Sequence, residues 1–329
     1  MNGVVVVGAS AGGVAALTEI LAGLPGDFPA PILIVMHIGD HPSVLPSILA
    51  RSCALPVRHA ADGEALAPGM VLVAQPGRHL MVERDGDAVR AVLVHGPREN
   101  HSRPAIDPLF RSAAIAYAGG AAGVILTGFL DDGVAGLAAI KTCGGTAIVQ
   151  DPADASASDM PRHALEQVEV DRCLPLAGIA GALVEWAAGL SERVVNGAAE
   201  APEWLTVENR FASGGGEMKQ LKRIATPSPY TCPECGGSLF SLNNAQLCRF
   251  RCHTGHSYTL LSLLREQEEA IEAALSKALR AVQEKESLAE QLAAEFSARS
   301  LVPEPGYVAL AQQARAEAEA LRALLTGGK

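Results

Sequence analysis

Three kinds of side chain that cooperate in acyl-transfer chemistry occur at matching places in this sequence. Ser10, His37 and the pair Asp131-Asp132 each come shortly after a short apolar run. Serine is a weak nucleophile until a base removes its proton, and that base needs a carboxylate to orient it. The pattern therefore predicts a serine hydrolase, with serine as nucleophile, histidine as proton carrier and a carboxylate behind the histidine.

The turn around Ser10 has the G-x-S-x-G form of a nucleophile elbow, because Gly8 and Gly12 flank the serine. A helix beginning after the turn would point backbone N–H groups at a developing oxyanion. Fold statistics alone favour a dinucleotide or phosphate cradle after a first strand. Ser10, however, stands where the dinucleotide motif needs its second glycine, and no P-loop lysine follows.

Each part of this pattern also has a structural explanation. A lone histidine such as His37 is more often structural, and the pair Asp131-Asp132 alone is more often a turn or a helix N-cap. The predicted sheet decides between these readings, because residues that follow parallel strands meet at one edge of the sheet. The coincidence of serine, histidine and carboxylate at strand ends favours an enzyme.

A second group of reactive residues lies in the C-terminal half. Cys232 and Cys235 form a C-x-x-C knuckle, and Cys252 and His256 follow with three residues between them. Three thiolates and an imidazole make a tetrahedral zinc set with no open position, so we expect structural rather than catalytic zinc. No catalytic cofactor is expected. Unligated residues and a redox C-x-x-C are the alternatives, and two further candidate ligands stay open, Cys248 and His253.

The elements that must position these residues follow from hydrophobic patterning. Continuous β-branched runs predict strands buried on both faces, and amphipathic segments between them predict helices. Two alternating segments around Asp85-Gly86-Asp87 predict a β-hairpin from His79 to Val94. We expect an α/β fold with a doubly wound, mostly parallel sheet and a hairpin insertion. The expected strands are Val4–Val7, Ile32–Met36, Val71–Ala74, Val124–Leu126 and Ala147–Val149, and the clearest helices are Val14–Leu24, Pro42–Arg51 and Asp107–Tyr117.

The chain changes character after residue 190, since residues 191–329 contain no aspartate. We expect a catalytic domain at 1–190, a linker at 191–229, a small zinc-ribbon-like module at 230–258 and a helical hairpin at 259–329. Within the linker, Trp204–Phe211 has the pattern of one short strand. The hairpin is either simply self-packed or a self-association or docking element.

Composition excludes several classes of protein. A net charge of −10, from 26 Lys+Arg against 36 Asp+Glu, argues against a general nucleic-acid-binding surface. The uncharged stretches are interrupted by glycines, which argues against a signal peptide and against membrane insertion. Seven cysteines without a secretory leader argue against a disulfide scaffold. These features predict a cytoplasmic protein.

The first part of the chain resembles the catalytic domain of the chemotaxis protein-glutamate methylesterase CheB, from Gly3 to about Val184. The resemblance rests on a series of motifs in order along the chain. These are Gly8–Gly13, the strand into His37, Ala61–Glu64, Pro68-Gly69, Gln75–Gly77, Ser102–Asp107, Gly123–Gly128, Asp132-Gly133 and Met160-Pro161.

The resemblance implies the site and the reaction. The family's catalytic triad maps onto Ser10, His37 and Asp132, with Asp131 as a less favoured orienter. The implied activity is hydrolysis of glutamate γ-methyl esters on chemoreceptors in chemotaxis or a related pathway, and the family also deamidates glutamine. The Arg-Phe-Arg-Cys segment ending at Cys252 is more loosely similar to relatives that lack a receiver domain, and a sequence starting at the first catalytic strand fits that group.

The sequence also departs from the family pattern at three positions. Ala11 replaces the usual threonine after the serine, and Phe129 and Leu130 replace methionine and glycine in the loop before the carboxylate. These changes leave an alternative function open, a catalytically drifted signalling scaffold with the same fold. A dinucleotide-binding protein is the third and weakest reading.

Overall fold

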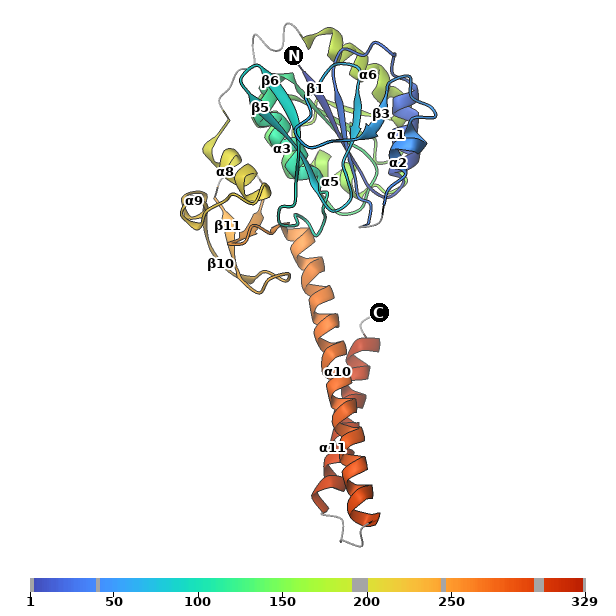
Figure 1. The fold of residues 1–329 in the computed structure, drawn as a ribbon, viewed down its shortest axis with the longest axis vertical. Helices are drawn as coiled ribbons and strands as arrows, with labels where there is room; N and C mark the ends of the chain where they lie inside the picture. The colour runs from blue at the N-terminus through green and yellow to red at the C-terminus, as the bar shows by residue number, and fades with distance from the viewer. Residues whose placement is uncertain (1–2, 40–41, 191–200, 244–246, 299–304, 328–329) are drawn as a thin grey trace. The chain divides into compact units, whose positions relative to one another are not determined.

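The computed structural model describes residues 3–39, 42–190, 201–243, 247–298 and 305–327. These residues divide into two compact units, 1–263 and 264–329. Figure 1 shows the elements of both units.

A seven-stranded sheet forms the centre of the first unit, and all of its neighbouring strands are parallel. This confirms the predicted α/β class. The strand order is β3-β4-β2-β1-β7-β8-β9. The strands are β1 (Val4–Ala9), β2 (Ile32–Met36), β3 (Val57–His59), β4 (Val71–Val73), β7 (Ala121–Ile125), β8 (Thr146–Gln150) and β9 (Arg172–Leu174).

Helices cover both faces of this sheet (Figure 1). In β1, Val4 and Val6 belong to the apolar cluster on one face, and Val5 and Val7 belong to the cluster on the other. An unbroken apolar run is therefore what a strand buried on both sides requires. One face is covered by α1 (Gly13–Ala22), α2 (Leu45–Leu49) and α6 (Leu176–Ala188), and the other by α3 (Ile106–Tyr117), α4 (Val134–Thr142) and α5 (Asp159–Gln167).

The order in which strands are added to the sheet reverses at β1. The strands after β1 lie first on the β2 side, and then the chain crosses to β7 on the other side of β1. In open α/β sheets, ligands bind beyond the carboxyl ends of the strands at such a switch point. The residues that follow β1, β2 and β7 therefore meet where a binding site is expected.

The hairpin insertion is present as predicted. It consists of β5 (His79–Asp85) and β6 (Ala88–Val94), which pair with each other in antiparallel register and pack against α3. A short 3₁₀ turn, Ala118–Gly120, joins α3 to β7.

The segment expected as a linker holds helices, α8 (Glu203–Ala212) and α9 (Met218–Ile224). The strand considered for Trp204–Phe211 is wrong, because these residues lie in α8. The buried residues Leu205, Glu208 and Ala212 follow helical spacing of three and four. The rest of the expected linker includes residues 191–200, which lie outside the described residues.

A small antiparallel sheet follows these helices and is called the cysteine sheet below. Its strands are consecutive in the chain and pair in the order β10-β11-β12-β13. The apolar centre of this sheet is small and includes Leu239, Phe250 and Tyr258 beside two cysteines. The strands are β10 (Ala225–Thr231), β11 (Ser238–Leu242), β12 (Arg249–Cys252) and β13 (Ser257–Thr259).

The chain ends in two long helices, α10 (Leu260–Ala298) and α11 (Pro305–Thr326). In the second unit they run antiparallel, with Lys285 Nζ 3.3 Å from a Glu317 carboxylate oxygen and the Phe296 and Tyr307 rings stacked at 5.6 Å. This agrees with the predicted C-terminal helices.

Across the parts of the chain that the structure describes, no helix combines the length and the apolarity that a bilayer span requires.

Candidate functional site

Ser10 and His37 lie side by side at the carboxyl edge of the parallel sheet. Ala9, the last residue of β1, pairs with Met36 at the end of β2, and the His37 N–H donates to the Ala9 carbonyl at 3.2 Å. Both side chains therefore emerge from adjacent strand ends, as the sequence predicts. In the part of the chain that the structure describes, the Ser10 hydroxyl has no hydrogen-bond partner, and such bonds often tighten only with substrate bound.

The loop after β7 closes over the serine turn. The Ser10 N–H donates to the Thr127 carbonyl at 2.9 Å, and the Thr127 hydroxyl donates to the Ala11 carbonyl at 2.8 Å. A side chain at Gly128 would place its Cβ 2.9 Å from the Cβ of Ser10 and still closer to Met160. Only glycine allows this approach, which places the backbone of the loop next to the nucleophile.

His37 is paired with the second aspartate of the Asp131-Asp132 pair. Its Nε2 lies 2.7 Å from Oδ2 of Asp132, which leaves Nδ1 for the serine side. Burial by itself raises the pKa of Asp132, but the hydrogen bond from His37 and its charge hold that pKa below the ordinary value. The Asp132 carboxylate is therefore ionised beside His37.

The start of α3 also holds the Asp132 carboxylate in place. The backbone N–H of Ile106 donates to Oδ2 at 2.7 Å, and that of Asp107 to Oδ1 at 3.4 Å. The first N–H groups of a helix have no partner within the helix and carry partial positive charge, so they favour an anion there. Asp132 thus caps α3 and faces His37 with the same carboxylate.

Asp131 points to a different partner. Its Oδ1 accepts a hydrogen bond from the Thr259 hydroxyl at 2.9 Å, and burial raises the pKa of Asp131 to about 6. Of the two aspartates, Asp132 is therefore the one that contacts His37. The family resemblance in the sequence favoured the same residue.

Two buried residues beside Asp132 were missed by sequence reasoning as site residues. Asn100 donates from Nδ2 to Asp132 Oδ1 at 3.0 Å and to Asp107 Oδ2 at 3.1 Å. Burial and the neighbouring Asp132 raise the pKa of Asp107 above its ordinary value. Asp107 lies in a motif that carried the resemblance, which was a usable signal, whereas Asn100 lies in a loop without a pattern.

A cavity of about 270 Å³ opens beside His37. Its lining contains more basic groups than acidic ones. The lining residues are His37, Ile38, Gly39, Arg98, His101, Ser102, Arg103 and Pro104.

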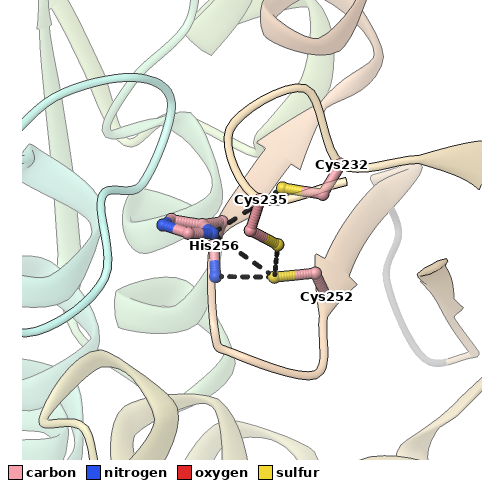
Figure 2. A group of neighbouring side chains, drawn as sticks. All are labelled: Cys232, Cys235, Cys252 and His256. Atoms are coloured by element: carbon pink, nitrogen blue, oxygen red, sulfur yellow. Dashed lines mark hydrogen bonds between the residues drawn. The ribbon is translucent and has the colours of Figure 1, made fainter. Parts of the chain in front are cut away.

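The four predicted metal ligands lie together at one end of the cysteine sheet (Figure 2). The sulfurs of Cys235 and Cys252 are 3.8 Å apart, and Nδ1 of His256 lies 3.6 Å from the Cys232 sulfur and 3.5 Å from the Cys252 sulfur. Tetrahedral zinc with Zn–S bonds of ~2.3 Å and Zn–N bonds of ~2.0 Å needs separations of about 3.8 and 3.5 Å. The donor set and its spacing therefore fit this ion.

Two tight turns and a carboxylate support the four residues. The Gly236 N–H donates to the Cys232 carbonyl at 2.8 Å, and the Gly255 N–H donates to the Cys252 carbonyl at 3.0 Å. Nε2 of His256 lies 3.1 Å from a Glu234 carboxylate oxygen, as is usual behind a histidine that binds metal. Two candidates that the sequence left open, Cys248 and His253, are not part of the cluster in the described residues.

The sequence pattern of the CheB methylesterase family matches residues 5–183, which is more than half of the chain. This chain belongs to the CheB methylesterase family. The resemblance noted in the sequence is thereby confirmed for the parallel-sheet domain.

Individual relatives of the CheB methylesterase family agree. A protein-glutamate methylesterase/protein-glutamine glutaminase 5 of Anaeromyxobacter dehalogenans is 46% identical over 181 residues, covering 54% of this chain and 49% of the relative. A protein of the same type from Moorella thermoacetica is 44% identical over 191 residues, covering 56% of this chain and 44% of the relative. The chain thus spans about half the length of the curated relatives it matches.

A solved structure matches the same part of the chain. The Thermotoga maritima CheB methylesterase catalytic domain superposes with a TM-score of 0.55 at 34% sequence identity, covering 56% of this chain and 98% of that domain. The CheB fold therefore accounts for the parallel-sheet part. The cysteine sheet and the terminal helices lie beyond the residues matched by the family.

Proposed function

We propose that this protein is a protein-glutamate methylesterase that hydrolyses glutamate γ-methyl esters on chemoreceptors in chemotaxis or related signalling. The observation that carries the proposal is the 2.7 Å contact between His37 and Asp132 at the strand end beside Ser10. Family membership and the names of the relatives support the substrate class.

The proposed reaction uses these three side chains in turn. The Ser10 oxygen attacks the ester carbonyl while His37 takes its proton, and the C–O bond to the methoxy group breaks as His37 returns the proton to form methanol. A water molecule, deprotonated by His37, then attacks the glutamyl-serine ester. The bond between the acyl carbon and the Ser10 oxygen breaks, His37 returns the proton to that oxygen, and glutamate is released. Asp132 keeps the imidazole oriented and stabilises its charged form through both steps.

Backbone N–H groups next to Ser10 are the proposed oxyanion donors. The candidates lie at the start of α1 and at Phe129 in the loop after β7, which Gly128 brings against the serine. A backbone donor at Phe129 does not depend on the side chain that departs from the family pattern. The same steps with an amide in place of the ester would release ammonia, so we include glutamine deamidation, which the names of the relatives also mention.

The experiment is methanol release from methylated chemoreceptor. Wild-type protein should release methanol, and Ser10→Ala should release none, while Ser52→Ala at an exposed turn should match the wild type. A fluorophosphonate that labels active serines should modify wild type and Ser52→Ala but not Ser10→Ala. Full methanol release by Ser10→Ala would reject the serine mechanism, and a wild type that neither reacts nor labels would favour the non-catalytic scaffold.

We further propose that Cys232, Cys235, Cys252 and His256 hold one structural zinc ion. The donor set, the separations of its atoms and the carboxylate of Glu234 behind His256 support this assignment. Four protein ligands leave no position for substrate, so the ion would supply stability to a sheet with a small apolar centre, and no catalytic step runs through it.

For the terminal helices we propose a role in self-association or partner docking. Exposed apolar side chains on both helices support it, with Ile271 and Leu288 each 59% and Leu324 63% exposed. Ile271→Lys with Leu288→Lys should lower the mass measured in solution, and an unchanged mass and receptor affinity would favour a self-packed hairpin.

A further inference from the structure

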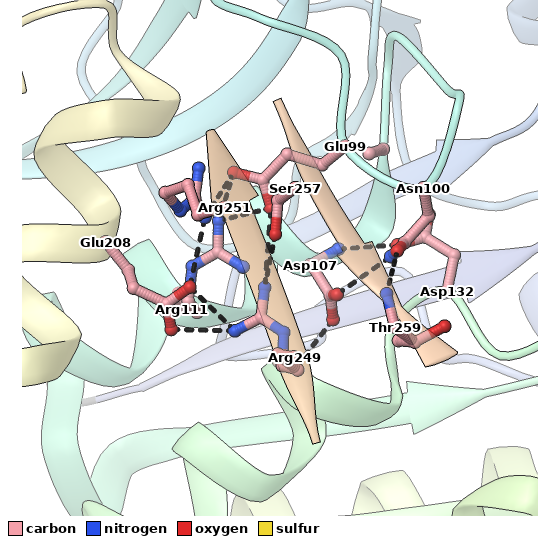
Figure 3. A network of polar contacts seen from close by, with 12 residues as sticks. Glu99, Asn100, Asp107, Arg111, Asp132, Glu208, Arg249, Arg251, Ser257 and Thr259 are labelled. Atoms are coloured by element: carbon pink, nitrogen blue, oxygen red, sulfur yellow. Dashed lines mark hydrogen bonds and ion pairs between the residues drawn. The ribbon is translucent and has the colours of Figure 1, made fainter. Parts of the chain in front are cut away.

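Asn100 lies between the catalytic carboxylate and the cysteine sheet. The residue is only 7% exposed, and its Nδ2 bridges two carboxylates, Asp132 at 3.0 Å and Asp107 at 3.1 Å (Figure 3). Two carboxylates in one buried place repel each other, and a neutral amide can donate one hydrogen to each. The side chain of Asn100 therefore determines the spacing and direction of the Asp132 carboxylate on the side away from His37.

The other end of the same amide is held by residues at the end of the cysteine sheet. Oδ1 of Asn100 accepts from the Thr259 N–H at 3.2 Å and from the Ser262 hydroxyl at 3.0 Å. A primary amide has two donor hydrogens and two acceptor lone pairs, so all four positions are filled. The arrangement also determines which way the amide faces, because the opposite orientation would place oxygen against the carboxylates and NH₂ against a donor.

The backbone of Asn100 is tied to the same strand. Its N–H donates to the Ser257 carbonyl in β13 at 2.8 Å, and Glu99 forms a parallel bridge with Ser257. Asn100 has φ = 48°, a left-handed conformation that asparagine adopts more readily than most residues. Side chain and main chain are thus both oriented by residues 257–262.

A buried cluster of charges anchors β12 beside this contact (Figure 3). Arg251 lies 3.0 Å from both Glu99 and Glu208, and Arg249 pairs with Glu208 at 2.7 Å. Arg111 from α3 completes the cluster by pairing with Glu99 at 2.7 Å. Because buried charges without partners are costly, this cluster keeps β12, and with it β13, in one place on the catalytic domain.

We infer that Asn100 is a positioning residue for Asp132 and that the cysteine sheet forms part of the catalytic unit by holding Asn100 in place. The inference rests on the proposed esterase function. It assigns to residues beyond the family match a task inside the active site, since Thr259 and Ser262 orient the amide that orients the carboxylate.

The test compares variants at both ends of the amide. Asn100→Asp keeps the shape but replaces the donor with a third carboxylate, and we expect kcat to fall about 10²-fold with KM within about twofold. Ser262→Ala removes the hydroxyl that donates to Asn100 and that also accepts from the Thr259 N–H and hydroxyl, and it should lower kcat about fivefold. Ser262→Thr keeps the hydroxyl and should retain kcat. Asn243→Asp is the matched control, because among the residues that the structure describes Asn243 bonds to Thr226 of the cysteine sheet and to Ile224 of the neighbouring helix.

Methanol release, fluorophosphonate labelling of Ser10 and thermal unfolding are measured on the same samples. Wild-type kcat in either Asn100→Asp or Ser262→Ala would overturn the inference, as would a loss in Asn243→Asp of the same size. If Asn100→Asp does not fold, the pair Ser262→Ala and Ser262→Thr decides. A wild type that labels but releases no methanol contradicts the proposed substrate alone, and equal labelling rates of wild type and Asn100→Asp would still overturn the inference.

Discussion

At the scale of residues, two adjacent aspartates have different hydrogen-bond partners and different pKa shifts. The Asp132 carboxylate is hydrogen-bonded to His37 and to a backbone N–H at the N-terminus of α3. The Asp131 carboxylate is buried and accepts a hydrogen bond from the Thr259 hydroxyl. Neighbours that stabilise charge lower the pKa of the first, and burial raises that of the second. Two identical, adjacent side chains thus differ in pKa because their surroundings differ.

This difference predicts unequal effects on activity. Asp132→Asn should lower kcat on the order of 10⁴-fold, because an amide cannot hold the imidazole in the required tautomer and stabilise its charge. Asp131→Asn should lower kcat far less, since the Asp131 carboxylate contacts Thr259 and not His37. Methanol release by the two variants is the measurement, and equal losses would contradict the assignment of Asp132.

The raised pKa of Asp131 predicts a dependence of stability on pH. A carboxyl with a pKa of about 3.9 unfolded and about 6 folded keeps its proton longer in the folded state, so wild-type stability falls as pH rises from 4 to above 6. Asp131→Asn removes this loss. Between pH 4 and 7.5 its free energy of unfolding should therefore rise relative to wild type, by on the order of 3 kcal/mol.

Denaturant unfolding across that pH range measures this effect. Asp87→Asn, in the exposed turn of the β5–β6 hairpin, controls for removal of a negative charge. A difference between Asp131→Asn and wild type that does not change with pH would contradict the prediction.

At the scale of elements, the cysteine sheet has a small apolar core. Few buried apolar side chains lie between its strands, and two of the buried residues there are cysteines. A small sheet of this kind normally needs a metal or another staple for stability.

We therefore predict one zinc per chain in wild-type protein by elemental analysis. Cys232→Ser should lose the ion and lower the unfolding temperature, because metal binding supplies folding free energy. Cys248→Ser is the matched control, as this exposed cysteine lies outside the cluster. Metal-replete wild type without zinc, or Cys232→Ser with unchanged zinc and stability, would reject the metal site.

At the scale of the whole chain, the first unit combines a family domain with an addition that is held by buried charges. Glu99 and Arg111 come from the family domain, while Glu208, Arg249 and Arg251 come from the segment after it. All five side chains are at most 3% exposed. Removing one of these side chains leaves the charged groups that it paired with buried and without that partner.

Arg251→Met should accordingly lower the free energy of unfolding by about 3–5 kcal/mol, the usual cost of breaking a buried pair. Arg315→Met in α11 removes a guanidinium that also contacts two glutamates, Glu286 and Glu290, but at the surface. Solvent screens that pair, so the control should change stability little. Denaturant unfolding of both variants tests the contrast, and a small effect of Arg251→Met would contradict it.

Much of the fold could be predicted from local patterns. The run Ile32–Met36 is strand β2 over the same residues, and the expected helix Asp107–Tyr117 begins one residue earlier as α3. The strands β3 and β9 were missed because each contains an arginine and neither forms an apolar run, whereas β4, which is equally short, does form one. Trp204–Phe211 was misjudged because its burial depends on which distant segments it meets.

The sequence by itself determined the family, the parallel sheet and the candidates Ser10, His37 and the pair Asp131-Asp132, because strand-end positions and a turn motif are properties of the local chain. Only the tertiary structure decided that Asp132 rather than Asp131 faces the histidine, and that Asn100 joins this carboxylate to residues 257–262. The contacts of Thr259 with Asn100 and Asp131 link positions more than a hundred residues apart in the chain, and the contact of His37 with Asp132 links positions 95 residues apart. Hydrogen bonds and burial at that separation depend on how the elements pack, which no local pattern encodes.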